Sequence, residues 1–207
     1  MVKSGDISIE AKINFSDDGS ISKDYVIDGD LENVKLRLLN KDNIENIKFG
    51  FILKNNDYLV YNALSFYQGI KFRSDEIRIK EKDDAFLFNG NISTSKNDLN
   101  LKTISKIFKL DLGTFENDKI IFSSNNKFSF KLSKKFKFSN VKANSKFNIE
   151  SLEYPNSSLK EFFPGYKDGV KFENNVVNLD YQNGNYKICE WQLSLFMQKR
   201  KSTINNR

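Results

Sequence analysis

The chain has 207 residues, of which 39% are hydrophobic and 14% aromatic, and this apolar content excludes global disorder. The 33 Lys and Arg against 27 Asp and Glu give a net charge of +6, and because both signs are spread along the chain we expect no nucleic-acid partner. The chain has no histidine and one cysteine, which excludes an intrachain disulfide and any histidine-based metal site or general base.

Apolar and polar residues alternate through most of the chain, which predicts strands with one apolar and one polar face. The alternation is clearest in ISIEAKINF, residues 7–15. It recurs over residues 34–38, 47–53, 59–63, 69–80 and 85–93. Within the last of these, Gly90 has the same parity as Phe86 and Phe88, so we expect a bulge or a close backbone approach there.

One segment has a different period. In LNLKTISKIFKLDL the apolar residues Leu101, Ile104, Ile107 and Phe108 are three or four residues apart, which is the spacing of one face of a helix. The sequence therefore predicts a single helix over about residues 98–110.

Strand alternation resumes after this helix and continues to about residue 189. Pro155 and Pro164 interrupt it and predict a loop over residues 155–169. The aromatic residues of that loop, Phe162, Phe163 and Tyr166, are expected to plug one end of the sheet, with a lid or a partner contact as the alternative. Residues 1–197 are therefore interpreted as a single β-rich segment, and the basic residues 198–207 as a disordered tail.

Motifs of catalysis are scarce, and we expect neither an enzyme nor a cofactor. The acidic pairs Asp17–Asp18, Asp75–Glu76 and Asp83–Asp84 are expected at turns, where carboxylates are solvated. Cys189 is expected to be a small half-buried residue beside Trp191. The alternation begins almost at once, in SGDISIEAK, so no signal peptide or membrane span is predicted in this chain.

The apolar faces of these strands need a cover, because apolar surface left in water forfeits about 25 cal/mol per Å². One short helix is too small to provide it. Three arrangements remain: a second sheet in a sandwich, closure into a barrel, or a sheet curled around an acyl chain. The period alone does not choose among them.

The apolar row itself can be named from parity. The residues predicted to line the apolar face are Ile7, Ile9, Ile13, Phe15, Leu36, Phe49, Phe51, Ile70, Phe72, Ile77, Ile79, Phe86, Phe88, Phe128, Phe130, Phe147, Ile149, Phe172 and Leu179. No catalytic residue and no metal ligand is predicted.

Residues 58–93, YLVYNALSFYQGIKFRSDEIRIKEKDDAFLFNGNIS, resemble a recurring unit of the AsmA-like bacterial envelope proteins. That family includes the TamB and YhdP type and is similar in architecture to bridge-like lipid-transfer proteins. The likeness lies in two strands, Y-x-G-I-x-F, a further strand and an aromatic pair closing on N-G-N-I. DLNLKTISKIFKL resembles the helical insert between such units, and residues 148–188 are similar again.

The resemblance implies a long antiparallel twisted sheet curled into an open groove. Phospholipid acyl chains would travel along it between the inner and outer membranes. It also implies a periplasmic location, with an inner-membrane anchor in the full-length protein. Because this chain lacks that anchor and the pattern fades after Ile188, we interpret it as a fragment. The alternative is a closed β-sandwich acting as an extracellular binding or adhesion module, and a sugar-active sandwich enzyme ranks last.

Overall fold

A computed structural model describes residues 2–22, 25–37, 42–108, 119–154, 170–192 and 195–196. The chain divides into two compact units. Unit 1 comprises Met1–Ser95, Ser124–Lys146 and Asn178–Cys189, and unit 2 comprises Lys96–Ser123, Phe147–Val177 and Glu190–Arg207. Strands β6 to β10 contribute residues to both units.

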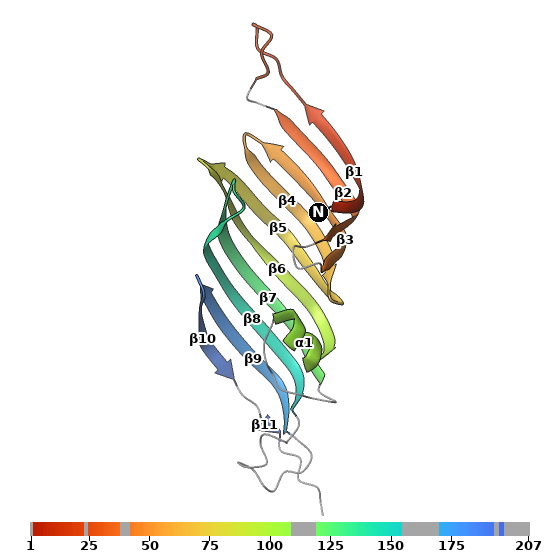
Figure 1. Cartoon of the computed structure of the whole chain (residues 1–207), viewed down its shortest axis with the longest axis vertical. Coiled ribbons are helices and arrows are strands. Elements are labelled where there is room, and N and C mark those ends of the chain that lie inside the picture. The colour runs from red at the N-terminus through yellow and green to blue at the C-terminus, as the bar shows by residue number, and fades with distance from the viewer. Residues whose placement is uncertain are drawn as a thin grey trace, which may run out of the picture. The chain divides into compact units, whose positions relative to one another are not determined.

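The described residues form mostly strands (Figure 1). The elements in chain order are β1 (Val2–Lys12), β2 (Val26–Arg37), β3 (Asn43–Lys54), β4 (Asp57–Tyr67), β5 (Ile70–Lys82), β6 (Ala85–Asn100), α1 (Leu101–Phe108), β7 (Lys119–Ser133), β8 (Phe138–Tyr154), β9 (Val170–Gln182), β10 (Asn185–Gln192) and β11 (Leu195–Phe196).

The strands pair in chain order, from β1 next to β2 through to β9 next to β10, and β11 pairs with β9. The sheet is antiparallel and is not closed. The predicted fold class, a mostly β open antiparallel sheet with one short helix, is therefore confirmed, and the described strands form neither a sandwich nor a barrel. None of the helical structure described is long and apolar enough to span a membrane.

The helix is shorter than the sequence predicts because strand β6 extends to Asn100. The Asn100 side-chain oxygen accepts hydrogen bonds from the Thr103 amide and the Thr103 hydroxyl, both at 2.7 Å. This is the geometry of an N-cap, which satisfies amide groups that have no partner within the helix. The cap fixes the start of α1 at Leu101, and residues 109–110 of the predicted helix lie outside the described residues.

Asparagines in a left-handed conformation interrupt several strands. Asn33 in β2, Asn46 in β3 and Asn62 in β4 have φ values of 54°, 49° and 52°, and each lies where the pairing register shifts by one residue. Asn tolerates this conformation better than other residues with a side chain. Such bulges bend a strand and increase its twist, so they shape the sheet of unit 1.

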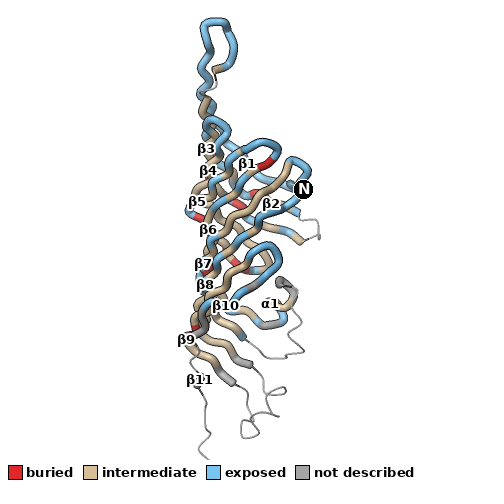
Figure 2. Tube along the Cα trace, turned by 90° about the vertical axis from the view of Figure 1, so that its left-hand side faces the viewer, coloured by how far each residue is buried: buried red, intermediate tan, exposed pale blue. Residues whose placement is uncertain are grey.

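Packing within unit 1 depends on contacts between neighbouring strands. Figure 2 shows few buried positions, and they are scattered along the strands. A Cβ atom placed on Gly29 would lie 2.8 Å from the Phe51 ring, and one on Gly50 would collide with the Tyr61 ring. Aromatic rings thus lie over glycines of the adjacent strand on both faces, which buries apolar area within a single layer.

Gly90 is also a site of close approach, as predicted, because a Cβ there would lie 3.0 Å from the Glu76 carbonyl oxygen. Two other expectations are wrong. Cys189 is exposed, and Asp75 and Glu76 lie inside β5 rather than at a turn. The predicted loop 155–169 with its aromatic cluster and the basic tail 198–207 lie outside the described residues.

Candidate functional site

The candidate site is one face of the sheet in unit 1, which we call the apolar face. Residues directly opposite each other in antiparallel strands point to the same side, so the register from β1 to β6 defines rows across the sheet. The apolar face contains the rows Ile9, Gly29, Phe51, Val60, Ile77, Gly90; Ala11, Ile27, Leu53, Tyr58, Ile79, Phe88; and Val2, Leu36, Ile44, Tyr67, Ile70.

These rows test how the predicted lining residues are placed. A shorter row, Ile7–Leu31–Phe49, lies on the same face, as do Phe72 and Phe86 by their two-residue spacing from Ile70 and Phe88. The predicted lining residues within β1 to β6 are therefore all brought to one face. Ile13 and Phe15 lie beyond the end of β1.

Aromatic contacts extend the apolar face to β7 and β8. Phe88 stacks on Phe130 with ring centroids 4.5 Å apart and planes inclined by 13°. Phe130 in turn contacts Phe128 at 5.9 Å and Phe138 at 5.4 Å. Such pairs contribute roughly 0.5–1.5 kcal/mol each beyond the area that they bury. They place the predicted residues Phe128 and Phe130 beside Phe88.

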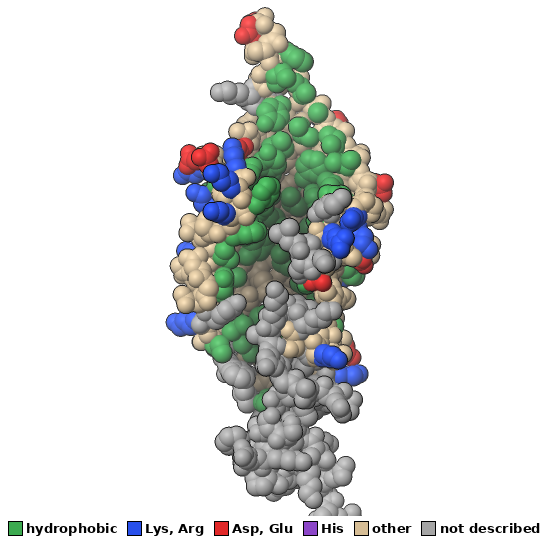
Figure 3. Space-filling model, in the orientation of Figure 1, with side chains coloured by type: hydrophobic (Ala, Val, Ile, Leu, Met, Phe, Trp, Pro, Cys, Tyr) green, Lys and Arg blue, Asp and Glu red, His purple; other side chains and the backbone are tan. Residues whose placement is uncertain are grey.

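Much of the apolar face is open to solvent. Ile7 and Ile9 in β1 expose 60% and 56% of their surface, and Phe138 in β8 exposes 66%. Figure 3 shows a band of hydrophobic side chains over the strands of unit 1, with charged side chains at its margins. Among the described residues, no second layer of strands covers this part of the face.

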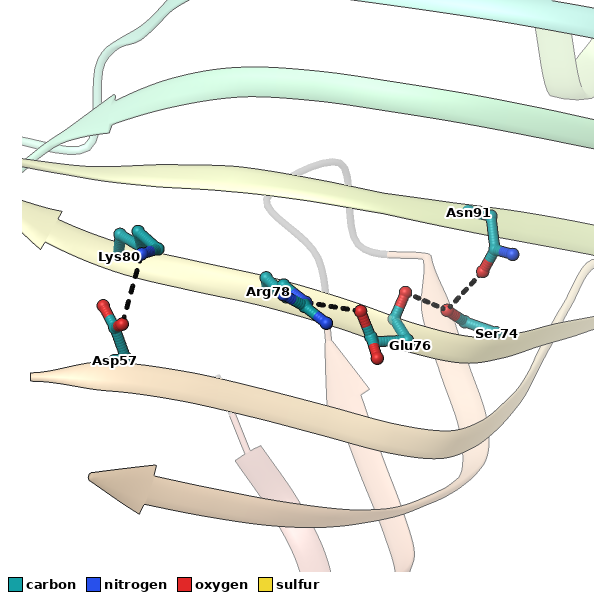
Figure 4. Close-up of polar contacts among 6 residues, drawn as sticks. All are labelled: Asp57, Ser74, Glu76, Arg78, Lys80 and Asn91. Carbon is teal, nitrogen blue, oxygen red and sulfur yellow. Dashed lines mark hydrogen bonds and ion pairs between the residues drawn. The ribbon is translucent and has the colours of Figure 1, made fainter.

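The opposite face of unit 1, the polar face, contains cross-strand ion pairs. Lys80 lies 3.3 Å from its register partner Asp57, and Arg78 lies 2.5 Å from Glu76 on the same strand (Figure 4). The Ser74 hydroxyl donates to the Glu76 carbonyl at 3.2 Å, which satisfies a backbone acceptor at a register shift. The ion pairs of these strands therefore lie on the polar face, where Leu59 and Leu87 also lie, opposite Arg78 and Lys80.

Two copies of one short pattern pair across β2 and β3, with their charged residues on the polar face. Glu32-Asn33-Val34-Lys35 lies in β2 and Glu45-Asn46-Ile47-Lys48 lies in β3. Lys35 pairs with Glu45 at 2.6 Å, and Lys48 pairs with Glu32. The hydrogen bond to Glu32 and its charge raise the pKa of Lys48. Exposed pairs of this kind add little stability because water screens them, so their main effect is to favour one register.

Unit 2 contains the predicted lining residues Phe147, Ile149 and Phe172. Phe147 packs against Phe122, with centroids 6.4 Å apart. Ile149 borders a shallow cavity of about 280 Å³ whose lining residues are Lys96, Phe122, Ser123, Asn148, Ile149, Glu150, Asn174, Asn175 and Val176. Phe172 pairs with Leu195 of β11. Leu179, in unit 1, is half-buried in β9.

The single cysteine is held by a carboxylate. The Cys189 thiol donates a hydrogen bond to Asp180 Oδ2 at 2.9 Å, and Asn144 donates to the other oxygen of the same carboxylate. The hydrogen bond to Asp180, desolvation and the charge of Asp180 raise the pKa of the Cys189 thiol. The hydrogen bonds from Cys189 and Asn144 lower the pKa of Asp180. Because only the thiolate is nucleophilic, we expect this exposed thiol to be less reactive than an ordinary cysteine.

We therefore expect Asp180→Asn to make Cys189 more reactive. Removing the carboxylate charge lowers the thiol pKa toward its ordinary value, so a larger thiolate fraction forms at a given pH. The rate of iodoacetamide alkylation is measured between about pH 7 and pH 10. Its increase with pH should begin at a lower pH in the variant than in the wild type. Asp57→Asn is the control, and an unchanged pH profile in Asp180→Asn would contradict the assigned hydrogen bond.

The bulges are the feature of the site that the alternation did not reveal. The three bulges that contain a left-handed asparagine follow the order apolar, any residue, Asn, apolar: Leu31-Glu32-Asn33-Val34, Ile44-Glu45-Asn46-Ile47 and Val60-Tyr61-Asn62-Ala63. Phe138-Ser139-Asn140-Val141 has the same order and a positive φ at Asn140. An apolar spacing of three inside a strand, with Asn before the second apolar residue, is thus the signal in the sequence. It keeps the apolar residues on one face although the alternation is broken.

No protein-family model, curated protein or solved structure matches this chain significantly. Among the described residues, no group of three or more acidic, histidine or cysteine side chains could hold a metal ion. The functional argument therefore depends on the two faces of the sheet.

Proposed function

We propose that this chain is a segment of an AsmA-like protein that carries phospholipid along the apolar face of its sheet. The observation that carries the proposal is the apolar face of unit 1, which lies opposite a face with ion pairs and has no covering layer among the described residues. An exposed apolar surface of this kind marks a site where an apolar partner binds, because its contact with water is unfavourable.

The energetics favour an acyl chain as that partner. Burial of each methylene group contributes about 0.8 kcal/mol, so a chain of sixteen carbons would contribute on the order of 13 kcal/mol before the cost of ordering it. The rows that run from β1 to β6 offer a continuous apolar path, because residues such as Ile9, Phe51 and Ile77 lie directly across from one another or from a glycine.

The polar face supports the same interpretation. Its lysines and carboxylates remain solvated, as Lys80 and Asp57 are, so this face can lie against water while the other holds lipid. In the AsmA-like arrangement the segment would lie in the periplasm, and an inner-membrane anchor would belong to another part of the full-length protein. No enzymatic activity and no cofactor form part of the proposal.

The test is the lipid content of the purified chain. We expect protein prepared without detergent to retain phospholipid, seen by native mass spectrometry as an added mass that organic extraction removes. Lipid-free protein should take up phospholipid from vesicles. A chain that carries no lipid and takes up none, while its melting transition shows it to be folded, would contradict the proposal.

A further inference from the structure

The turn between β7 and β8 carries the most exposed large hydrophobic residue described. We call Lys134, Lys135, Phe136 and Lys137 the basic tip. Phe136 exposes 82% of its surface, although it lies in an ordered turn. The Phe136 amide donates to the Ser133 carbonyl at 2.8 Å, and the Ser133 amide donates to the Lys137 carbonyl at 3.0 Å. These hydrogen bonds define the backbone of the turn at Phe136.

The backbone at Phe136 is unusual for its residue type. Its φ is 58°, and the other non-glycine residues described with positive φ are all Asn, Asp or Gln. This conformation is unfavourable for a residue with a bulky side chain, whereas Gly or Asn adopts it readily. A large exposed side chain at a position that suits Gly points to a role outside the fold, because unfavourable backbone conformations of this kind cluster at functional positions.

The residues next to Phe136 in the turn are lysines, and acidic residues lie in the neighbouring turn. Lys134 is paired with Glu81 at 2.8 Å, whereas Lys135 and Lys137 form no ion pair with any residue that the structure describes. The Lys134 amide donates to the Asp84 carbonyl at 3.0 Å, so the β5–β6 turn with its acidic residues lies alongside. Two lysines without acidic partners therefore flank one exposed aromatic ring.

From this arrangement we propose that the basic tip docks on an anionic membrane surface, with Phe136 entering the interface and Lys135 and Lys137 contacting lipid phosphates. An aromatic ring beside lysines matches the chemistry of that interface, which is apolar below and negatively charged above. The acidic β5–β6 turn lies close by and weakens the attraction of the lysines to the membrane. We therefore expect membrane binding to need both the aromatic ring and the two lysine charges. This role goes beyond lipid carriage and does not depend on the apolar face.

The test is flotation with vesicles of phosphatidylcholine containing about one quarter phosphatidylglycerol. The full chain should bind these vesicles, bind pure phosphatidylcholine weakly, and release as salt rises from about 0.05 M to about 0.3 M. Exchanging Lys135 and Lys137 together for Gln should lower binding about 25-fold, since each charge near such a surface contributes about fivefold. Phe136→Gly should lower binding about tenfold, as removal of a buried aromatic side chain predicts.

Two further measurements separate the tip from other causes. Phe136→Gly should melt at the same temperature as the wild type or higher, because Gly adopts this φ without strain. Its lipid content by native mass spectrometry should equal that of the wild type. Ile21→Asn is the control, because Ile21 is exposed and follows Asp17 and Asp18 closely in the sequence rather than lysines. Vesicle binding by this variant should not change.

Several results would overturn the proposal. These are no vesicle binding by the wild type, full binding by Phe136→Gly, a lower melting temperature in that variant, or an equal loss in Ile21→Asn. Tighter binding to nucleic acid or to an acidic protein than to vesicles would likewise assign the tip to another partner. If the purified Phe136→Gly chain also loses its bound lipid, the loss of vesicle binding is due to a change in the apolar face and not to the basic tip.

Discussion

Phe88→Asp is expected to abolish lipid binding while the chain remains folded. Phe88 is half-buried and stacks on Phe130, so its loss should cost about 2–3 kcal/mol and lower the melting temperature by roughly 5–10 °C. On an open face the new carboxylate stays hydrated. An acyl chain on the same row would have to desolvate it at a cost of several kcal/mol, so bound lipid should fall by at least about tenfold. Native mass spectrometry and the melting transition measure both effects.

The neighbouring residue provides the matched control. Leu87 lies on the same strand but on the opposite face, in the row of Lys80, and it is exposed. Leu87→Asp introduces the same charge into the same strand and should leave bound lipid unchanged. If Phe88→Asp unfolds the chain instead, the ring lies in a sealed core, and if both variants lose lipid equally, the faces do not differ in function.

Gly29→Val is expected to destabilise the sheet although valine favours strands. A Cβ on Gly29 would lie 2.5 Å from the Ser8 carbonyl oxygen of β1 as well as close to the Phe51 ring. The ring can move, but the carbonyl belongs to the backbone that pairs with β2. We expect a cost of about 3 kcal/mol, which lowers the melting temperature by roughly 6–12 °C.

Ala11→Val controls for the change in propensity and bulk. Ala11 lies on the same face in the adjacent strand, opposite Ile27, and it is exposed. The added methyl groups therefore enter solvent-accessible space, and the melting temperature should change little. Equal melting temperatures for Gly29→Val and the wild type would show that β1 does not pack against β2 at this position.

The two-residue period sufficed to predict the strands and, in β5, the face to which the apolar residues belong. In this strand Ile77 and Ile79 alternate with Arg78 and Lys80, and the structure places the isoleucines on the apolar face and the charges on the polar face. This prediction succeeds because side-chain direction in a strand follows from backbone geometry alone. The helix was predicted for the same reason, from its different period.

In β4 the two-residue period was wrong about the face, because the predicted series Leu59, Tyr61, Ala63 is broken at Asn62 and Leu59 lies opposite Arg78 on the polar face.

The tertiary structure decided three things that this period does not encode. It showed that the sheet is open, whereas the alternation is equally compatible with a sandwich or a barrel. Closure depends on contacts between strands that are distant in the sequence. It showed that Cys189 is exposed and forms a hydrogen bond with Asp180. The hydrogen-bond partner of Cys189 depends on the pairing of β9 with β10, which the period does not specify. It also revealed the bulges at Asn33, Asn46 and Asn62.

The bulges explain how sequence and structure fit together. At Asn33 the alternation breaks, since Leu31 and Val34 are three residues apart, yet both lie on the apolar face because their partners Phe49 and Ile47 are two apart. The sequence by itself determined which residues are apolar and their local period. Only pairing with the next strand decided that the extra residue is accommodated as a bulge, because a register is a property of two strands and not of one.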